Sequence, residues 1–172
     1  MKRLSIAALG LLLAVGCSSS STTPTTQAGT TTTRFVATMQ PSQEAPPITN
    51  SENSASGTAT IDFNITRDAS GAITAGVANF QINTTGFPAS TTIITAAHIH
   101  TGAAGVGGPI LVDTGVSRDV TVSGGAATFS RNSITLKTAD AEAILANPAG
   151  FYFNVHTVAN PGGVMRAQLV KQ

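Results

Sequence analysis

The chain has 172 residues, of which only 10% are charged, and its nine Lys and Arg and eight Asp and Glu leave a formal net charge of +1. A chain without a basic surplus lacks the attraction on which nucleic-acid binding depends, so we expect no nucleic-acid partner. The single cysteine excludes an internal disulfide framework and a cysteine-rich zinc site.

The first sixteen residues have the pattern of an export signal. Lys2 and Arg3 precede an apolar run at residues 4–15 that is too short to cross a bilayer as a stable anchor. The run ends in LAVGC at residues 13–17, which resembles the lipobox of bacterial lipoproteins, where a diacylglycerol group is attached to the cysteine before cleavage. We therefore expect residues 1–16 to be a lipoprotein signal peptide and Cys17 to be the lipidated N-terminus. The alternative is an ordinary secretory signal followed by an unmodified cysteine.

Residues 17–33 are expected to form a tether after the lipid. They consist almost entirely of Ser and Thr, a composition that buries too little apolar surface to fold. The several acyl chains of a lipoprotein would make membrane attachment stable. Because Ser18 after the cysteine resembles the outer-membrane sorting pattern, we expect an exported protein of the cell envelope, anchored in the outer membrane through Cys17.

Residues 34–172 are expected to fold as one all-β domain. At residues 58–66, Ile61, Phe63 and Ile65 alternate with polar residues, as in a strand with one buried face. Gly- and Pro-rich turns separate the runs at a spacing typical of antiparallel sandwiches. We therefore predict an antiparallel Greek-key β-sandwich or barrel with one short helix. Further strands are expected at residues 34–39, 73–83, 91–100, 110–112, 119–122, 126–130, 151–157 and 164–170.

The one helix is expected to lie just before Asn147 and Pro148, which would end it. Thr138 can cap the helix start, and acidic residues in the first turns favour the positive end of the helix dipole. The apolar residues Ala143, Ile144 and Leu145 supply a face for packing. We expect this helix to cover one open end of the sandwich.

All three histidines of the chain fall in two predicted strands. His98 and His100 are two residues apart, so their side chains share one strand face while Ile99 enters the core. The same alternation places His156 on the outer face of strand 151–157, beside Asn154. If the two strands are neighbours, three neutral imidazoles at about 2.0–2.1 Å can hold zinc or copper, and an oxidising compartment favours Cu(II). The alternative is that the histidines bond only to turn carbonyls.

Other kinds of active site have little support in the sequence. The loop at residues 102–108 is rich in glycine but lacks the Lys and Ser/Thr of a phosphate-binding loop. No Gly-x-Ser-x-Gly motif is present, and the carboxylates form no evident acid and base pair. These observations favour a binding module over an enzyme.

Several segments occur together in an order that is known from a protein family: QEAPP (43–47), SGTAT (56–60), AHIHTG (97–102), GVGGP (105–109), YFNVHT (152–157) and ANPGG (159–163), followed by Arg166. They resemble the CHRD domain, which is named for chordin. The resemblance implies an exported domain, because bacterial members are exported proteins and the animal namesake is an extracellular antagonist of growth factors. The family usually has an acidic residue before its Ile-Arg pair and a glycine after it, whereas this chain has Val164-Met165-Arg166-Ala167.

Three residues in these segments are further candidates for ligands or for residues that orient the histidines, namely Arg166, Asn154 and Glu44. For Arg166, the alternative is an exposed charge on a strand of alternating pattern. A weaker likeness links the order His98, His100, His156 to the copper ligands of copper/zinc superoxide dismutase, a Greek-key sandwich. The chain lacks the fourth histidine, the zinc loop and the cysteine pair of that family, so a full dismutase site is excluded.

Three functions remain open at this point. The first is a cell-envelope binding module of the CHRD type that holds copper or zinc through His98, His100 and His156. The second is a mononuclear copper redox enzyme that resembles part of a dismutase site. The third is a structural or adhesive envelope protein without a metal, whose protein partner the sequence does not name.

Overall fold

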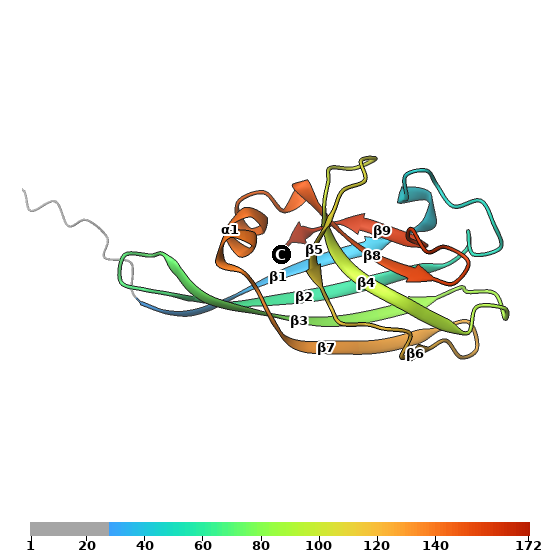
Figure 1. Cartoon of the computed structure of the whole chain (residues 1–172), viewed down its shortest axis with the longest axis horizontal. Helices are drawn as coiled ribbons and strands as arrows, with labels where there is room; N and C mark the ends of the chain where they lie inside the picture. The colour runs from blue at the N-terminus through green and yellow to red at the C-terminus, as the bar shows by residue number, and fades with distance from the viewer. Residues whose placement is uncertain (1–27) are drawn as a thin grey trace, which may run out of the picture.

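The computed structural model describes residues 28–172, so the predicted signal peptide, the predicted lipidation site Cys17 and most of the predicted tether lie outside the described residues. Two antiparallel sheets face one another in the described part of the chain (Figure 1). One short α-helix lies at one end of them. The predicted all-β sandwich with one short helix is confirmed.

Sheet A contains the longest strands and forms one wall of the core. Its strand order is β10-β1-β2-β3-β7, so β1, β2 and β3 follow one another as a meander. Phe35, Ile61 and Phe80 are fully buried on its inner face, in the alternation expected for strands with one buried side. The bounds are β1 Gly29–Met39, β2 Ser56–Arg67, β3 Ile73–Thr85, β7 Ala127–Thr135 and β10 Val170–Lys171.

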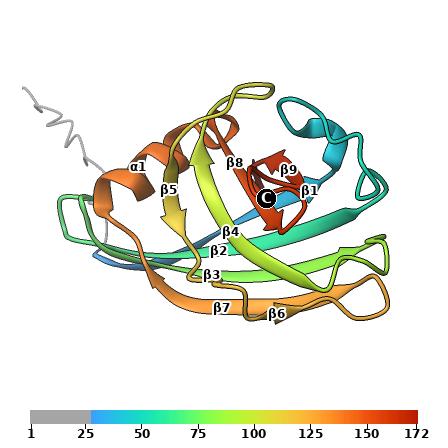
Figure 2. The same ribbon diagram turned by 45° about the vertical axis from the view of Figure 1, so that its right-hand side comes forward.

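Sheet B forms the opposite wall, and Figure 2 shows its strands β4 and β5 passing over sheet A. Its order is β5-β4-β8-β9, and the short strand β6 also pairs with β4. β4 and β8 are neighbours although more than fifty residues separate them, and their register places His98 opposite Asn154 and His100 opposite Tyr152. The bounds are β4 Ile93–Thr101, β5 Ile110–Asp113, β6 Val120–Thr121, β8 Phe151–Thr157 and β9 Met165–Gln168.

The core between the sheets consists of aliphatic side chains and a few phenylalanines. Phe80 of sheet A stacks on Phe153 of sheet B, with ring centroids 5.8 Å apart. Ile99, Phe153 and Val155 are fully buried in this layer, as the sequence predicts. Because successive side chains of a strand point to opposite faces, the histidines next to these residues lie on the outer side of sheet B.

The first strand begins earlier than the sequence predicts. β1 starts at Gly29 and pairs with β2 along its whole length, so residues 29–33, which were expected in the tether, belong to sheet A. Thr32 donates a hydrogen bond to Asn64 Oδ1 at 2.6 Å, and Thr30 and Thr66 pair through their hydroxyls. A run of threonines suits a tether, but threonine is also a good strand former, and composition alone does not separate the two.

Two other strands also differ from their predicted bounds. β7 continues to Thr135 instead of ending near Ser130, with a register shift opposite β3. The single strand expected at residues 164–170 is two strands, because the chain leaves sheet B after Gln168 and joins sheet A at Val170. Leu169, between them, is buried in the core and so marks the crossing. A period-two pattern does not reveal a change of sheet.

Helix α1 (Thr138–Ala146) buries Ala141 and Ile144 and packs against β3, at one end of the sandwich as predicted. The prediction that Thr138 caps it is wrong. Lys137 occupies the cap position in an extended conformation without a side-chain cap bond, so Thr138 is already helical. Two short 3-10 turns, η1 (Pro41–Gln43) and η2 (Pro148–Gly150), flank other strands. Among residues 28–172, none of the helices has the length and apolar character needed to cross a bilayer.

Candidate metal centre

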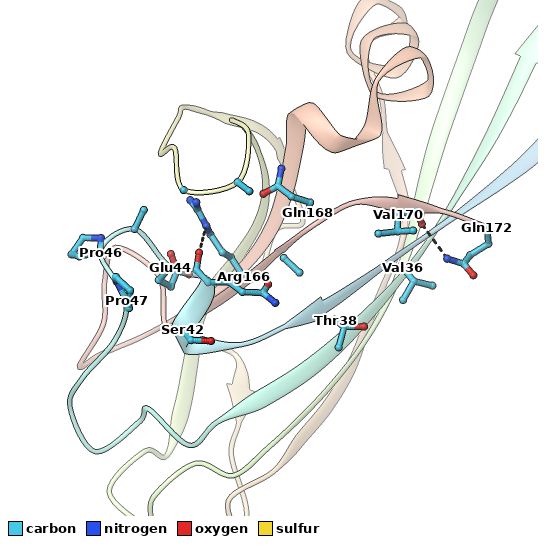
Figure 3. Close-up of a pocket in the computed structure, with 15 residues that line it drawn as sticks. Val36, Thr38, Ser42, Glu44, Pro46, Pro47, Arg166, Gln168, Val170 and Gln172 are labelled. Atoms are coloured by element: carbon cyan, nitrogen blue, oxygen red, sulfur yellow. Dashed lines mark hydrogen bonds between the residues drawn. The ribbon is translucent and has the colours of Figure 1, made fainter.

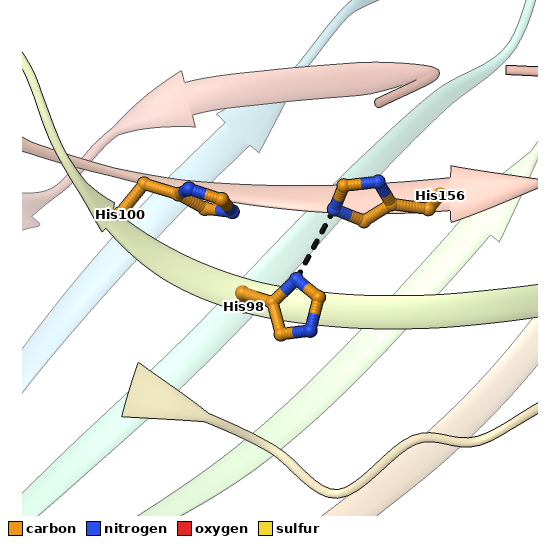
Figure 4. A group of neighbouring side chains, drawn as sticks. All are labelled: His98, His100 and His156. Atoms are coloured by element: carbon orange, nitrogen blue, oxygen red, sulfur yellow. Dashed lines mark hydrogen bonds between the residues drawn. The ribbon is translucent and has the colours of Figure 1, made fainter. Parts of the chain in front are cut away.

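The pairing of β4 with β8 brings all three histidines together on the outer side of sheet B (Figure 4). His98, His100 and His156 each offer one ring nitrogen, and these three nitrogens lie within 4.8 Å of one another. We call these residues the histidine cluster. Their side chains are nevertheless buried, with exposures of 8%, 8% and 7%, although the sequence places them on an outer face. Loops fold back over this face and cover them.

Two of those loops fix the orientation of two imidazole rings. His100 Nδ1 lies 3.0 Å from the carbonyl oxygen of Gly108, and His156 Nδ1 lies 2.9 Å from that of Pro161. A carbonyl oxygen only accepts hydrogen bonds, so each Nδ1 must carry the proton and donate. Nε2 of His100 and Nε2 of His156 are therefore unprotonated, and each can act as an acceptor or as a metal ligand. This is how protein metal sites commonly set the tautomer of a histidine ligand.

The third ring, that of His98, has Nδ1 toward the cluster and Nε2 toward Asp113. His98 Nδ1 lies 3.2 Å from His156 Nε2, and because that Nε2 carries no proton, His98 Nδ1–H is the donor. His98 Nε2 lies 3.6 Å from Oδ1 of Asp113, which is a cross-strand neighbour on β5 with an exposed side chain. If the proton of His98 moves from Nδ1 to Nε2, Asp113 can accept a hydrogen bond from Nε2–H. Nδ1 then has a free lone pair.

Lone pairs of several acceptors converge at the centre of this cluster. Nε2 of His100 is buried and has no hydrogen-bond partner among the described residues. Oδ1 of Asn154 lies 3.0 Å from Nε2 of His156, so one acceptor faces another. Four-coordinate zinc or copper with bonds of about 2.0–2.1 Å separates its ligand atoms by about 3.3 Å, close to the 3.2 Å between His98 Nδ1 and His156 Nε2. A bound cation would relieve the repulsion between the acceptors.

Burial keeps the cluster neutral, which metal ligation requires. The pKa of His98 is lowered to about 4, mainly because burial disfavours the charged ring and secondly through the neighbouring His156, although Asp113 opposes the shift. Burial also lowers the pKa of His156, and the Pro161 carbonyl partly offsets this. At neutral pH both imidazoles are uncharged, with one ring nitrogen free of a proton and able to ligate a metal.

The stability of the metal-free protein should depend on pH through these two rings. Between the ordinary histidine pKa of about 6.5 and the lowered value in the folded state, the unfolded chain binds a proton that the folded chain does not. The contribution of His98 and His156 to stability should therefore be complete above pH 6.5 and fall as the pH drops toward 4. Urea unfolding with a chelator present, at several pH values between 7.5 and 5, measures it.

Glu44 complicates this measurement because its shift has the opposite sign. Burial raises the pKa of Glu44 to about 7, against the effects of Arg166 and of the Ala45 N–H. The folded state then binds a proton between about pH 4.5 and 7 that the unfolded chain does not. The titration should therefore be made in a Glu44→Gln background, with Glu44→Gln/His98→Asn as the comparison. An equal pH dependence of the two proteins would contradict a buried, neutral His98.

Arg166 is buried in the structure, so its alternative interpretation as an exposed strand charge is wrong. It is 2% exposed because two loops fold over β9 and both bond to it. Its Nε donates to the Gln43 carbonyl at 2.7 Å and its Nη1 to that of Val106 at 3.2 Å. Its guanidinium lies 4.3 Å from the ring centre of Tyr152, which in turn stacks on His100. Arg166 thus lies next to the cluster through two neighbours, Tyr152 and its cross-strand partner Asn154.

Glu44 and Arg166 line a groove rather than the histidine cluster itself, and Figure 3 shows them with Pro46 and Pro47. The groove has a volume of about 920 Å³ and continues along Val170 at the C-terminal strand. No hydrogen bond joins Glu44 to a histidine within residues 28–172. Of the three additional candidates, only Asn154 contacts the cluster directly.

The residues that orient the rings were not predicted from the sequence. Gly108 is placed by its loop, where a side chain would meet the Thr101 carbonyl oxygen at 1.8 Å, so only glycine fits. Nothing in the sequence distinguishes Asp113 from the other carboxylates. The available signal was proximity along the chain, because Gly108 and Pro161 each follow a histidine within eight residues.

Comparison with known proteins gives one match. A family model described as the CHRD domain matches residues 35–169, which is most of the chain and contains the whole histidine cluster. A search of curated proteins found no match, and a search of solved structures found none.

Proposed function

We propose that this chain, which belongs to the CHRD domain family, is a metal-binding module of the cell envelope that holds one copper or zinc ion. His98, His100 and His156 are the proposed ligands. The observation that carries the proposal is the fixed orientation of His100 and His156, whose Nδ1 protons are held by backbone carbonyls while both Nε2 lone pairs point inward. If the rings served only to bond turn carbonyls, their remaining nitrogens would not need to face one another.

The donor set favours copper or zinc over harder ions. Three neutral imidazole nitrogens suit both metals, and copper binds such ligands more tightly in the usual divalent order. Asn154 Oδ1 is the oxygen nearest to the proposed nitrogen ligands and is the candidate for a fourth position. Magnesium and calcium prefer sites built from oxygen, so we expect neither to compete.

Isothermal titration of the purified full chain, in mild detergent and with metal analysis, tests this proposal. The chain should carry Cys17→Ser, which removes the only thiol and hence a competing ligand. We expect one Cu(II) or Zn(II) per chain with micromolar affinity or better. Binding no tighter than millimolar would end the metal proposal and favour a structural or adhesive role. Superoxide removal by the copper-loaded chain that His100→Ala abolishes would indicate a redox enzyme instead.

Asp113→Asn should weaken metal binding by about 10–100-fold, the range typical of residues that orient a metal ligand. The substitution removes the negative charge that stabilises the proton on His98 Nε2 and so disfavours the tautomer in which Nδ1 is free. Asp119→Asn is a matched control, because Asp119 is also exposed and pairs with Arg131 away from the cluster. Metal titration of both variants measures the difference in affinity. Equal affinities would contradict a role for Asp113.

We also propose that the chain is an exported lipoprotein anchored through Cys17. The support is the sequence itself, in which a charged start and a short apolar run precede the lipobox-like residues 13–17. Cells grown with radiolabelled palmitate should incorporate the label into the wild-type chain and into a Ser19→Ala control, but not into Cys17→Ser. Label in Cys17→Ser, or none in the wild type, would contradict the anchor.

A further inference from the structure

We propose that the buried carboxylate of Glu52 is a positioning residue for the metal site, acting through the turn that joins β8 to β9. The inference rests on the proposed metal function, since it concerns how His156 is held ready. Glu52 lies in the segment between η1 and β2, more than one hundred residues before His156 in the sequence. Its side chain is nevertheless buried against the end of β8, at 1% exposure.

The Glu52 carboxylate accepts hydrogen bonds from three neutral side chains. The hydroxyls of Thr91 and Thr157 donate to its two oxygens, the latter at 2.6 Å. The side-chain amide of Asn160 donates to the same oxygen as Thr157. Of these three donors, Thr157 is the last residue of β8 and Asn160 lies in the turn that follows, whereas Thr91 lies in the loop between β3 and β4. The carboxylate therefore ties this turn to the body of the domain.

The turn held by Glu52 carries the carbonyl that orients His156. Thr157 directly follows His156, and Asn160 directly precedes Pro161, whose oxygen accepts from His156 Nδ1 at 2.9 Å. Within the turn, the Asn160 N–H donates to Thr157 Oγ1 and the Thr157 N–H donates to the Asn160 carbonyl. Thr157 and Asn160, the two ends of the short segment that leads into Pro161, are thus both bonded to one carboxylate. If the turn moves, the bond that sets the tautomer of His156 is lost.

A carboxylate at this place is difficult to explain as a stabilising contact alone. No cation in the described part of the chain forms an ion pair with Glu52. A buried anion with only neutral partners carries a desolvation penalty that its hydrogen bonds offset only in part. The carboxylate accepts at both oxygens, so it receives Thr91, Thr157 and Asn160 together. A glutamine amide could keep the two bonds from Thr157 and Asn160 on its oxygen, with its NH2 donating to Thr91 Oγ1, so only loss of both oxygens removes these contacts.

Two isosteric substitutions separate positioning from stability. Thr157→Val and Thr91→Val each remove one hydroxyl bond to Glu52, but only Thr157 adjoins the turn that carries Pro161. Thr157→Val also removes the acceptor of the Asn160 N–H in that turn. In the full chain with Cys17→Ser, we expect Thr157→Val and Glu52→Ala to weaken Cu(II) binding by about 10–100-fold, as for other residues that orient a ligand. Thr91→Val should stay within about threefold of the parent chain. Equal affinities of Thr91→Val and Thr157→Val would overturn the inference.

A second measurement does not depend on the metal. Nitrogen-15 NMR of the metal-free chain reports which ring nitrogen of His156 is protonated. We expect a protected Nδ1–H in the parent chain and in Thr91→Val, and a mixture of tautomers in Glu52→Ala and Thr157→Val. A parent chain that binds no copper but has this NMR pattern would refute the proposed function while leaving the positioning role intact. An unchanged His156 signal in all variants would refute the positioning role alone.

Discussion

Replacement of His156 by alanine should lower the affinity for Cu(II) and for Zn(II) by more than about 100-fold, beyond the effect expected for residues that only orient a ligand. The substitution removes one of three proposed nitrogen ligands and also the acceptor for His98 Nδ1–H. His100→Ala should have a similar effect, because His100 Nε2 is the buried lone pair without a partner among the described residues.

The control for these variants should remove a side chain of similar burial outside the cluster. Thr84→Ala is suitable, because Thr84 is buried and its hydroxyl bonds only to the Ala127 carbonyl in sheet A. Its affinity should equal that of the parent chain in the same titration. If His156→Ala and His100→Ala bind copper as tightly as Thr84→Ala does, the ion is held elsewhere.

Phe153→Ala should lower the free energy of unfolding by about 3–5 kcal/mol, the usual cost of deleting a large buried ring. Phe153 is fully buried and stacks on Phe80 across the two sheets, so its loss leaves a cavity between them. Urea unfolding of the metal-free chain measures the change. Val170→Ala, at an exposed position on β10, should change stability by less than about 0.5 kcal/mol.

Phe153 also lies between Tyr152 and Asn154 on β8, so this variant tests the alternation that separates core from site. We expect its metal affinity to fall much less than that of His156→Ala as long as the chain remains folded. A loss of stability below about 1 kcal/mol would show that the ring is not packed between the sheets.

The side chains of β4 and β8 that face the core, and those that face outward, could be predicted from the sequence because strand alternation is a local property. It placed Ile99, Phe153 and Val155 in the core and the histidines on the opposite side of sheet B. The pairing of β4 with β8 could only be assumed, since no local signal specifies which strands become neighbours. For the same reason, the sequence did not reveal that the threonines before Arg34 belong to β1 or that the chain changes sheet at Leu169.

What the sequence did not indicate are the contacts made by loops across long distances in the chain. Arg166 has the pattern of an exposed strand residue, but the Gln43 and Val106 carbonyls that bury it come from remote loops. Glu52 bonds to Thr157 over 105 residues, so nothing near either residue suggests the contact. Loops convert a solvent-facing histidine pair into a buried cluster, and their path depends on the whole fold.

A structure of the copper-loaded or zinc-loaded chain, with anomalous scattering recorded at the absorption edge of the metal, tests the central proposal most directly. We predict one strong peak bonded to His98 Nδ1, His100 Nε2 and His156 Nε2 at about 2.0–2.1 Å. Asp113 should then accept a hydrogen bond from His98 Nε2. A peak elsewhere, or none after loading at concentrations where calorimetry shows saturation, would contradict the proposed metal centre.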